Sequence, residues 1–348
     1  MSIGKLVVTG GYGFVGTNLI LAAAARGTDI VVLDDLSVGD GQYVKNVSHR
    51  LVEGDIRDRD VVSQALDGAD AVVHLAAHTS VVDSQTDPEH DCDVNVRGTM
   101  TVLRGCVDAG VKRFVLASSN APLGEQTPPV DEERVPKPMS PYGASKLAGE
   151  GYCSSFAASY GLGTTVLRFA NVYGMYSTHK SSVVAKFLRR IQAGEGLVIY
   201  GDGEQTRDFV HVEDLAQGIL AALQTPDAAG ETFQLGSGTE TSVLTLVDLL
   251  RQVAGGDVQI THEPERPGEI RRNWTDIGKA QRILGYQPSK QLAPSLAQMH
   301  EWFQGQRAEV TESAIVSPTV SPTVSADDFM DADEEEAVAK RLRDLGYL

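Results

Sequence analysis

The chain has 348 residues, enough for one large domain or two modest ones, and its 42% hydrophobic and 22% charged residues are ordinary for a soluble globular protein. Its formal net charge of −17 argues against a nucleic-acid or anionic-membrane partner, because a surface that follows phosphates needs a basic patch. A phosphate-bearing ligand would therefore have to be met locally by a few placed cationic residues.

The chain enters a strand-like segment at KLVVTG, residues 5–10, with no charged start, apolar stretch and cleavage site before it. The apolar run LILAAAA at 19–25 is far too short to span a bilayer. We therefore expect a cytoplasmic protein with no membrane association.

Short apolar, β-branched runs alternate with longer helical patterns over the first 170 residues. Continuous apolar strands that alternate with helices predict an α/β fold, with a doubly wound parallel sheet covered on both faces. The predicted strands are 5–10, 29–35, 49–55, 70–77, 112–119 and 164–171, with helical patterns at 17–27 and 94–110 between them.

The segment TGGYGFVG at 9–16 follows the first predicted strand and opens a helix. Its glycines fit a dinucleotide fingerprint in two ways, as Gly11, Gly13 and Gly16 or as the wider variant that begins at Gly10. Such glycines permit a tight turn and let the backbone approach a pyrophosphate at the helix N-terminus. The acidic pair at residues 34 and 35, which ends the second predicted strand, favours NAD over NADP because a carboxylate there repels a 2′-phosphate.

Two further strand ends carry candidate cofactor contacts. Asp55 ends the third predicted strand, where it would either meet the adenine amino group or cap a helix. The small residues of HLAA at 74–77 would let a cofactor cross the sheet edge, and we expect His74 to be a packed core residue and no catalyst.

The segment SPYGASK at 140–146 places Tyr142 and Lys146 one helical turn apart on one face. Tyrosine titrates near 10, so ionising it at pH 7 costs roughly 4 kcal/mol. A cation about 4 Å away, at an effective dielectric near 20, supplies roughly that much. We therefore expect the charge of Lys146 to stabilise the Tyr142 phenolate enough for Tyr142 to act as a base. Ser119, at the end of the fifth predicted strand, would hydrogen-bond to the substrate oxygen that Tyr142 deprotonates.

After residue 171 the pattern breaks up into helices at 181–194 and 211–224 and short strands at 197–201 and 231–238. The last of these strands is expected to return to the sheet, so a second, smaller domain would be interleaved with the first. From about residue 308 a Pro/Ser/Thr repeat and an acidic run begin. The end of this tail spaces Val338, Leu342 and Leu345 on one helical face, and either solvation or docking on a partner protein remains open.

Cysteine usage is sparse. Cys92, Cys106 and Cys153 are odd in number and widely spaced, which favours reduced core thiols over a disulfide framework or a metal site. We expect no bound metal.

The chain resembles the extended short-chain dehydrogenases through ten motifs that occur in the same order. These motifs are TGGYGFVG, VLDDLS, GDIRD, HLAA, NVRGT, ASS, SPYGASK, LRFANVYG, GDGEQTRDFVHVEDLA and RPGEIRRNWTDIGKAQRILGY. More narrowly, they resemble the NAD-dependent nucleotide-sugar epimerase/dehydratase family, and UDP-glucose 4-epimerases within it. The likeness covers roughly residues 4–303 and implies a Rossmann-type sheet with an interleaved C-terminal substrate domain.

This resemblance implies boundaries and roles. The NAD-binding domain would comprise 1–172 with about 206–238, the nucleotide-sugar domain about 173–205 with 239–305, and the tail 308–348. Ser119, Tyr142 and Lys146 would be catalytic. NAD would be held by Gly10, Gly13, Phe14, Val15, Gly16, Asp34, Asp35, Ser37, Asp55, Ile56, Leu75, Ala76, Ala77, Asn95, Tyr142 and Lys146. The UDP-sugar would be held by Ser119, Tyr142, Asn171, Val198, Tyr200, Arg207, Arg266 and Glu269.

The residues after Ser119 separate the reactions that share this machinery. Dehydratases of this pattern carry Glu, often Asp-Glu, where this chain has Asn120 and Ala121, so elimination of water lacks its acid. We therefore expect NAD-dependent 4-epimerisation of a UDP-hexose, neutral or N-acetylated. Met175 favours a neutral sugar, whereas His179 and Lys180 keep UDP-glucuronate open.

Other functions remain open. A nucleotide-sugar reductase would need added NADH or NADPH, and a dehydratase stays an alternative although its acid is missing. A dinucleotide-binding scaffold would use its tail to recruit a partner protein. The resemblance also implies a homodimer through helices near 94–110 and 141–160.

Overall fold

The computed structural model describes residues 3–256, 258–265 and 270–315. The chain divides into two units, Met1–Gln304 and Gly305–Leu348, and the account that follows concerns the first. The expected tail features at 316–348 lie outside the described residues.

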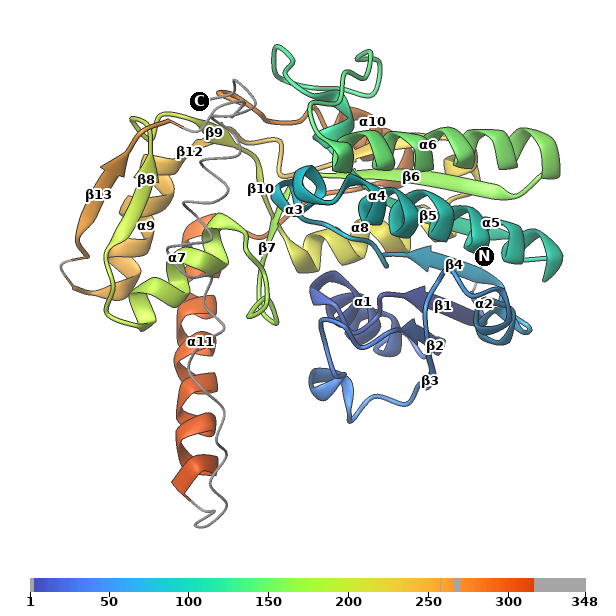
Figure 1. Cartoon of the computed structure of the whole chain (residues 1–348), viewed down its shortest axis with the longest axis horizontal. Coiled ribbons are helices and arrows are strands. Elements are labelled where there is room, and N and C mark those ends of the chain that lie inside the picture. Colours follow the sequence, from blue (N-terminus) through green and yellow to red (C-terminus); the bar gives the residue numbers. More distant parts are fainter. Residues whose placement is uncertain (1–2, 257, 266–269, 316–348) are drawn as a thin grey trace. The chain divides into compact units, whose positions relative to one another are not determined.

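The first unit alternates strands with helices (Figure 1). The strands are β1 Lys5–Thr9, β2 Asp29–Asp34, β3 Arg50–Glu53, β4 Ala71–His74, β5 Arg113–Ser119, β6 Gly163–Phe169, β7 Asn171–Tyr173, β8 Leu197–Tyr200, β9 Thr206–Arg207, β10 Phe209–His211, β11 Thr232–Leu235, β12 Thr241–Ser242 and β13 Ile260–Glu263. The helices are α1 Phe14–Ala24, α2 Arg59–Leu66, α3 Val81–Thr86, α4 Pro88–Cys92, α5 Thr99–Asp108, α6 Pro141–Tyr160, α7 Val183–Gln192, α8 Val212–Gln224, α9 Val243–Ala254, α10 Gly278–Leu284 and α11 Leu292–Ile315.

The main sheet has seven strands in the order β11-β6-β5-β4-β1-β2-β3, and all its neighbours are parallel. The chain winds outward from β1 to β3, then crosses to β4 and winds the other way. Ligands bind such sheets at the carboxyl ends of the strands where the order reverses, which here lies between β1 and β4. The predicted doubly wound parallel sheet is confirmed, and β11 returns to it as expected.

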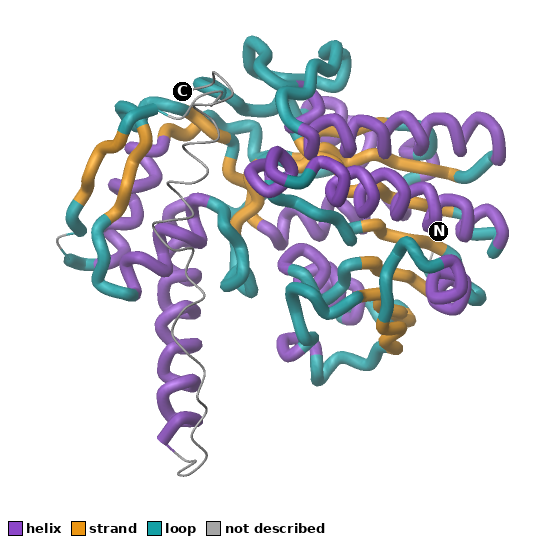
Figure 2. The backbone as a smooth tube through the Cα atoms, in the orientation of Figure 1, coloured by secondary structure: helices purple, strands orange, loops and turns teal. Residues whose placement is uncertain are grey.

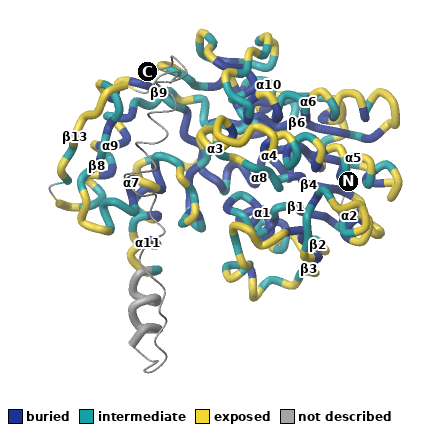
Figure 3. Tube along the Cα trace, in the orientation of Figure 1, coloured by how far each residue is buried: buried dark blue, intermediate teal, exposed yellow. Residues whose placement is uncertain are grey.

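Alternate residues of the strands face opposite sides of the sheet. Leu6 and Val8 of β1 belong to a core with α1, α8 and α10, whereas Val7 belongs to a core with α2, α5 and α6. Both faces are therefore buried, which explains the near-continuous apolar runs in the sequence. Figure 3 shows buried residues concentrated along these strands.

A separate cluster joins α7, β8, α9 and the start of α11, and includes Phe187, Ile199, Leu250 and Phe303. Strands of this region pair outside the main sheet, β8 with β13, β7 with β10 and β9 with β12 (Figure 2). Apart from Phe209, this cluster falls within the segments expected to form the second domain, whose boundaries stay a prediction.

The cysteine prediction is partly wrong. Cys106 and Cys153 are buried and reduced, and burial raises the pKa of both thiols. Cys92 is reduced but exposed, because it ends the short helix α4 on its outer side. Among the described residues, no helix is long and apolar enough to cross a membrane.

Candidate active site

The glycine-rich loop connects β1 to α1 at the switch point of the sheet. Gly10 has φ +65°, and a Cβ there would lie 2.7 Å from the Ala76 backbone nitrogen. A Cβ on Gly16 would overlap the carbonyl oxygens of Gly10 and Gly11. The structure thus favours the wider fingerprint that begins at Gly10.

The start of α1 is suited to a phosphate. Its N-cap is Gly13, which offers no side-chain cap, so the first backbone N–H groups are available to an anion. Phe14 and Val15 form the first turn. These residues fit the pyrophosphate of NAD.

The two carboxylates after β2 differ in their surroundings. Asp34 is buried, and its oxygens accept hydrogen bonds from the backbone nitrogens of Tyr12 and Leu36, both at 2.9 Å. Burial raises the Asp34 pKa, and the charge of Asp35 adds to that rise. Asp35 is exposed and accepts from the backbone and hydroxyl of Ser37 at 3.0 and 2.6 Å. The pair is placed for ribose hydroxyls, and that role stays a prediction.

Asp55 binds Arg57. The Arg57 Nε lies 3.0 Å from both carboxylate oxygens, and this bonding lowers the Asp55 pKa. Asp58 caps α2, accepting from Asp60 and Val61, so the alternative that Asp55 caps a helix is wrong. Ile56, which follows Asp55 in the sequence, is buried against Gly98.

The end of β4 is fixed by a buried hydrogen-bond chain. His74 Nδ1 lies 2.7 Å from Thr9 Oγ1, and its Nε2 lies 3.0 Å from Thr99 Oγ1. Burial lowers the His74 pKa to about 3, so this ring is neutral and structural, as expected. The residues that follow, Leu75, Ala76 and Ala77, are partly exposed at the switch point.

Asn95 joins the segment after β4 to α6. Its Oδ1 accepts from the His78 nitrogen at 2.8 Å, and its Nδ2 lies 3.1 Å from Ser145 Oγ. It lies in a π-helical turn, Asp93–Gly98, a feature found often at functional sites.

Helix α6, which carries Tyr142 and Lys146, begins at the sequence SPYG of residues 140–143. Ser140 is the N-cap, accepting from the Gly143 nitrogen at 3.1 Å, and Pro141 occupies the first helical position. Tyr142 therefore lies in the first turn of α6. A Cβ on Gly143 would lie 2.7 Å from the Ala121 carbonyl oxygen, so glycine allows the helix to approach the end of β5.

The three predicted catalytic residues come together. The Ser119 hydroxyl is near enough to the Tyr142 phenol to lower its pKa. The Lys146 ammonium lies 5.9 Å from the Tyr142 ring centre and donates to the Ala117 carbonyl at 3.0 Å. Ser119 Oγ also accepts from the Ala121 nitrogen at 3.0 Å, so its own proton can point to the phenol or a substrate oxygen.

The electrostatics correct one expectation. Burial raises the Tyr142 pKa, the Ser119 hydrogen bond lowers it, and the charge of Asp91 raises it. Burial also lowers the Lys146 pKa to about 8. Lys146 alone therefore does not hold Tyr142 ionised, because burial disfavours the charged phenolate. The expectation from the sequence counted only the attraction of the lysine and left out this desolvation.

No carboxylate follows Ser119. Asn120 is 9% exposed, and its Nδ2 lies 3.3 Å from Asn273 Oδ1. Ala121 begins a short 3₁₀ turn, Ala121–Leu123. The site therefore has an amide where a dehydratase needs an acid.

The expected substrate residues lie on several elements. Asn171 begins β7 and is exposed, and its backbone nitrogen donates to the Asp208 carbonyl at 2.9 Å. Val198 and Tyr200 are the two partly exposed residues of β8. Arg207 of β9 donates from Nη1 to the carbonyls of Thr206 and Ile270 at 2.7 and 2.8 Å. Arg266 and Glu269 lie outside the described residues, so all these substrate roles stay predictions.

Two neighbours of Tyr142 escaped sequence reasoning. Ser84 of α3 is buried, and its hydroxyl oxygen accepts from the Tyr142 backbone nitrogen at 3.2 Å. Asp91 of α4 is fully buried, and its charge acts on both Tyr142 and Lys146. Neither stands in a pattern, since both meet α6 only through the tertiary fold.

Comparison with known proteins supports these features. Residues 6–236 match the model of the NAD dependent epimerase/dehydratase family. A UDP-glucose 4-epimerase of Mycolicibacterium smegmatis is 35% identical over 309 residues, which are 86% of this chain and 98% of the relative. The structure of UDP-glucose 4-epimerase with UDP-glucose from Thermotoga maritima has a TM-score of 0.83 and 34% identity, covering 87% of this chain and 99% of the other. UDP-N-acetylglucosamine 4-epimerase from Methanobrevibacter ruminantium, in complex with UDP-N-acetylmuramic acid, has a TM-score of 0.83 and 30% identity, covering 88% and 100%.

Proposed function

Because the chain belongs to the NAD dependent epimerase/dehydratase family, we propose that it inverts the C4 hydroxyl of a UDP-hexose through a 4-keto intermediate. The observation that carries this proposal is the cluster of partly exposed Ser119 with buried Tyr142 and Lys146, with an amide at position 120. The relatives described above are named 4-epimerases of UDP-glucose or of UDP-N-acetylglucosamine, which supports a UDP-hexose as the substrate class.

The side chains divide the proton chemistry. Bound NAD supplies a hydride acceptor in the first half-reaction and a hydride donor in the second. Tyr142 accepts the proton of the C4 hydroxyl and later returns it to the alkoxide on the other face. Ser119 donates a hydrogen bond to the same oxygen, and Lys146 stabilises the phenolate. Since burial opposes the phenolate, the positive charge of oxidised nicotinamide is the second contribution that Tyr142 requires.

Purified protein incubated with UDP-galactose, UDP-glucose and their N-acetyl forms, without added reductant, tests the proposal. Epimer formation followed by NMR is the expected result. No product from any of the four, or product only with stoichiometric NADH, contradicts it and favours a reductase.

A second substrate class has one observation in its favour. Lys180 follows β7, burial lowers its pKa, and its charge in turn lowers the Lys146 pKa, so it lies near the catalytic centre. Among the described residues, no hydrogen bond or ion pair involves its ammonium group. A carboxylate at C6 would provide a counter-charge, so UDP-glucuronate is the second candidate substrate.

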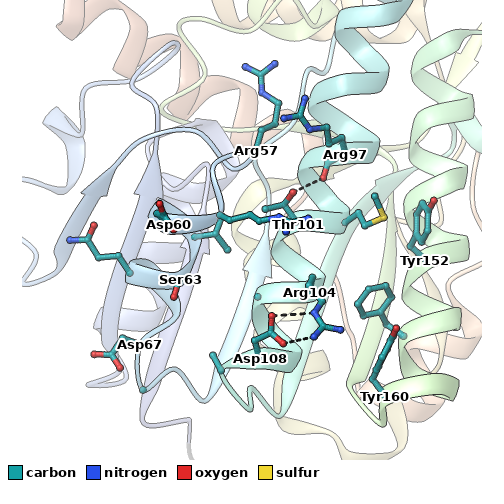
Figure 4. A pocket seen from close by; sticks show the side chains of 18 of the residues that line it. Arg57, Asp60, Ser63, Asp67, Arg97, Thr101, Arg104, Asp108, Tyr152 and Tyr160 are labelled. Atoms are coloured by element: carbon teal, nitrogen blue, oxygen red, sulfur yellow. Dashed lines mark hydrogen bonds and ion pairs between the residues drawn. The ribbon is translucent and has the colours of Figure 1, made fainter.

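The enzyme is also proposed to be a homodimer. A hollow of about 1480 Å³ lies over α2, α5 and α6 (Figure 4). Met100 of α5 and Tyr160 of α6 line it, and they are 39% and 51% exposed. Both side chains expose apolar surface to this hollow, which charged residues such as Arg97 and Arg104 also line, and a second copy of the chain would bury them. Light scattering should give twice the chain mass, falling to a monomer in Tyr160→Glu; a monomeric wild type contradicts the proposal.

A further inference from the structure

A buried carboxylate lies one helical turn beyond the catalytic lysine. Tyr142, Lys146 and Glu150 follow one another at intervals of four residues in α6, so they share one face of the helix. Glu150 is only 8% exposed. An ionised carboxylate is costly to bury unless it is paired and hydrogen-bonded, so its partners carry weight.

Those partners come from two neighbouring strands. Arg168 of β6 donates from Nε to Glu150 Oε1 at 3.0 Å and from Nη2 to Oε2 at 2.7 Å. Ser118 of β5 donates from its hydroxyl to Oε1 at 2.6 Å. Ser118 and Arg168 are 3% and 5% exposed, so water does not compete for these bonds.

The strand positions of these partners connect them to the site. Ser118 and Arg168 are opposite each other in the register of β5 and β6, so both can face a single carboxylate on α6. Ser118 immediately precedes Ser119, whose hydroxyl lowers the Tyr142 pKa. The carboxylate therefore ties the helix that carries two catalytic groups to the strand that carries the third.

We propose that Glu150 is a positioning residue, whose bonds to Ser118 and Arg168 fix Tyr142 and Lys146 of α6 against Ser119 of β5. The inference rests on the proposed epimerase function, because only that reaction gives the alignment a purpose. The fork of Arg168 makes the tie directional, since a bidentate pair constrains angle as well as distance.

The tie has an electrostatic consequence. The charges around Lys146 are those of Asp91 from α4 and Glu150, which raise its pKa, and of Lys180, which lowers it. Removing the Glu150 charge, with Arg168 left unpaired, must lower the Lys146 pKa. If kcat requires the protonated Lys146 ammonium, the variant should lose activity at a lower pH than wild type does, so the basic limb of the kcat profile moves. The shift of this limb reports the lost charge, whereas a fall in kcat at unchanged KM reports the lost alignment.

Glu150→Gln tests the proposal, because glutamine keeps the size and can still accept from Ser118. We expect kcat to fall by about 30-fold or more with KM within about twofold, since small misplacements cost rate more than binding. The basic limb of the kcat profile should move to lower pH by about half a unit or more. Glu150→Asp keeps the negative charge, so the basic limb of its kcat profile should lie at the wild-type pH. Because the side chain is shorter, only part of kcat should be recovered.

Two matched variants complete the design. Glu231→Gln removes the pair of Glu231 with Lys279, away from α6, and should leave kcat and the limb unchanged. Ser118→Ala keeps the ion pair between Glu150 and Arg168 and should lower kcat about fivefold at unchanged KM. This variant tests the proposal even if Glu150→Gln does not fold. A folded Glu150→Gln with unchanged kcat and pH limb overturns the proposal, as does an unchanged kcat in Ser118→Ala.

A substrate-free readout separates this proposal from the reaction. Hydrogen exchange of peptides spanning the end of β5 and the start of α6 should be about fivefold faster in Glu150→Gln, while α9 is unchanged. An inactive wild type with this exchange pattern would defeat the epimerase proposal and leave the positioning tie standing. Unchanged exchange would defeat the tie alone.

Discussion

Replacing Lys146 with methionine removes a buried cation while preserving much of its volume. The ammonium lies 5.9 Å from the Tyr142 ring centre, and both side chains are at least nine-tenths buried. At an effective dielectric of about 20, Coulomb's law gives about 3 kcal/mol for the attraction between ammonium and phenolate. This corresponds to roughly a hundredfold in the ionisation equilibrium of Tyr142.

The pH profile of kcat/KM should therefore change at both limbs. Wild type should lose activity above about pH 8, where Lys146 releases its proton. In Lys146→Met this limb is absent, and the acidic limb should move to higher pH by about two units. At pH 7 the variant should be roughly a hundredfold slower and should recover as the pH rises.

The assay is initial epimerisation rate from pH 5 to 10, with Lys186→Met, an exposed lysine of α7, as the matched control. The control should reproduce the wild-type profile. A Lys146→Met profile that is lowered uniformly at every pH, without recovery in base, would refute the electrostatic role of the lysine.

Three further outcomes are expected. Gly143→Ala places a Cβ 2.7 Å from the Ala121 carbonyl, so α6 must shift, and kcat should fall by about tenfold with little loss of NAD; an unchanged kcat would show that the approach is not limiting. Lys180→Met should lower kcat/KM for UDP-glucuronate by about tenfold while UDP-glucose is unaffected, and equal effects on both sugars would remove the uronate assignment. Deleting residues 308–348 should leave turnover unchanged in the same assay, and a large loss would place the tail in the catalytic unit.

Sequence reasoning succeeded where local pattern determines structure. Apolar runs buried on both faces predicted the parallel sheet, and the segment SPYGASK predicted a helix that carries Tyr142 and Lys146 on one face. The four-residue interval of Tyr142 and Lys146 survives in the fold because one helical turn fixes it. The two glycine fingerprints, in contrast, could be separated only by the backbone, where Gly10 has a positive φ and Gly11 does not.

The failures concern the environment that distant elements create. The direction of the Tyr142 pKa was wrong because burial by α3, α4 and β5 cannot be summed from a seven-residue motif. Ser84, Asp91 and Arg168 reach α6 from 18 to 58 residues away in sequence, through contacts with no spacing rule. Cys92 was expected in the core because cysteines usually are, yet α4 ends at the surface.

The account depends most directly on Tyr142 as the group that takes and returns the proton. Tyr142→Phe keeps the ring and removes only the hydroxyl, so NAD and UDP-sugar should still bind. The initial rate of conversion of UDP-galactose to UDP-glucose should fall by about a thousandfold, in the range typical of a lost acid–base group. Conversion at the wild-type rate by a pure, NAD-loaded Tyr142→Phe protein would contradict the account.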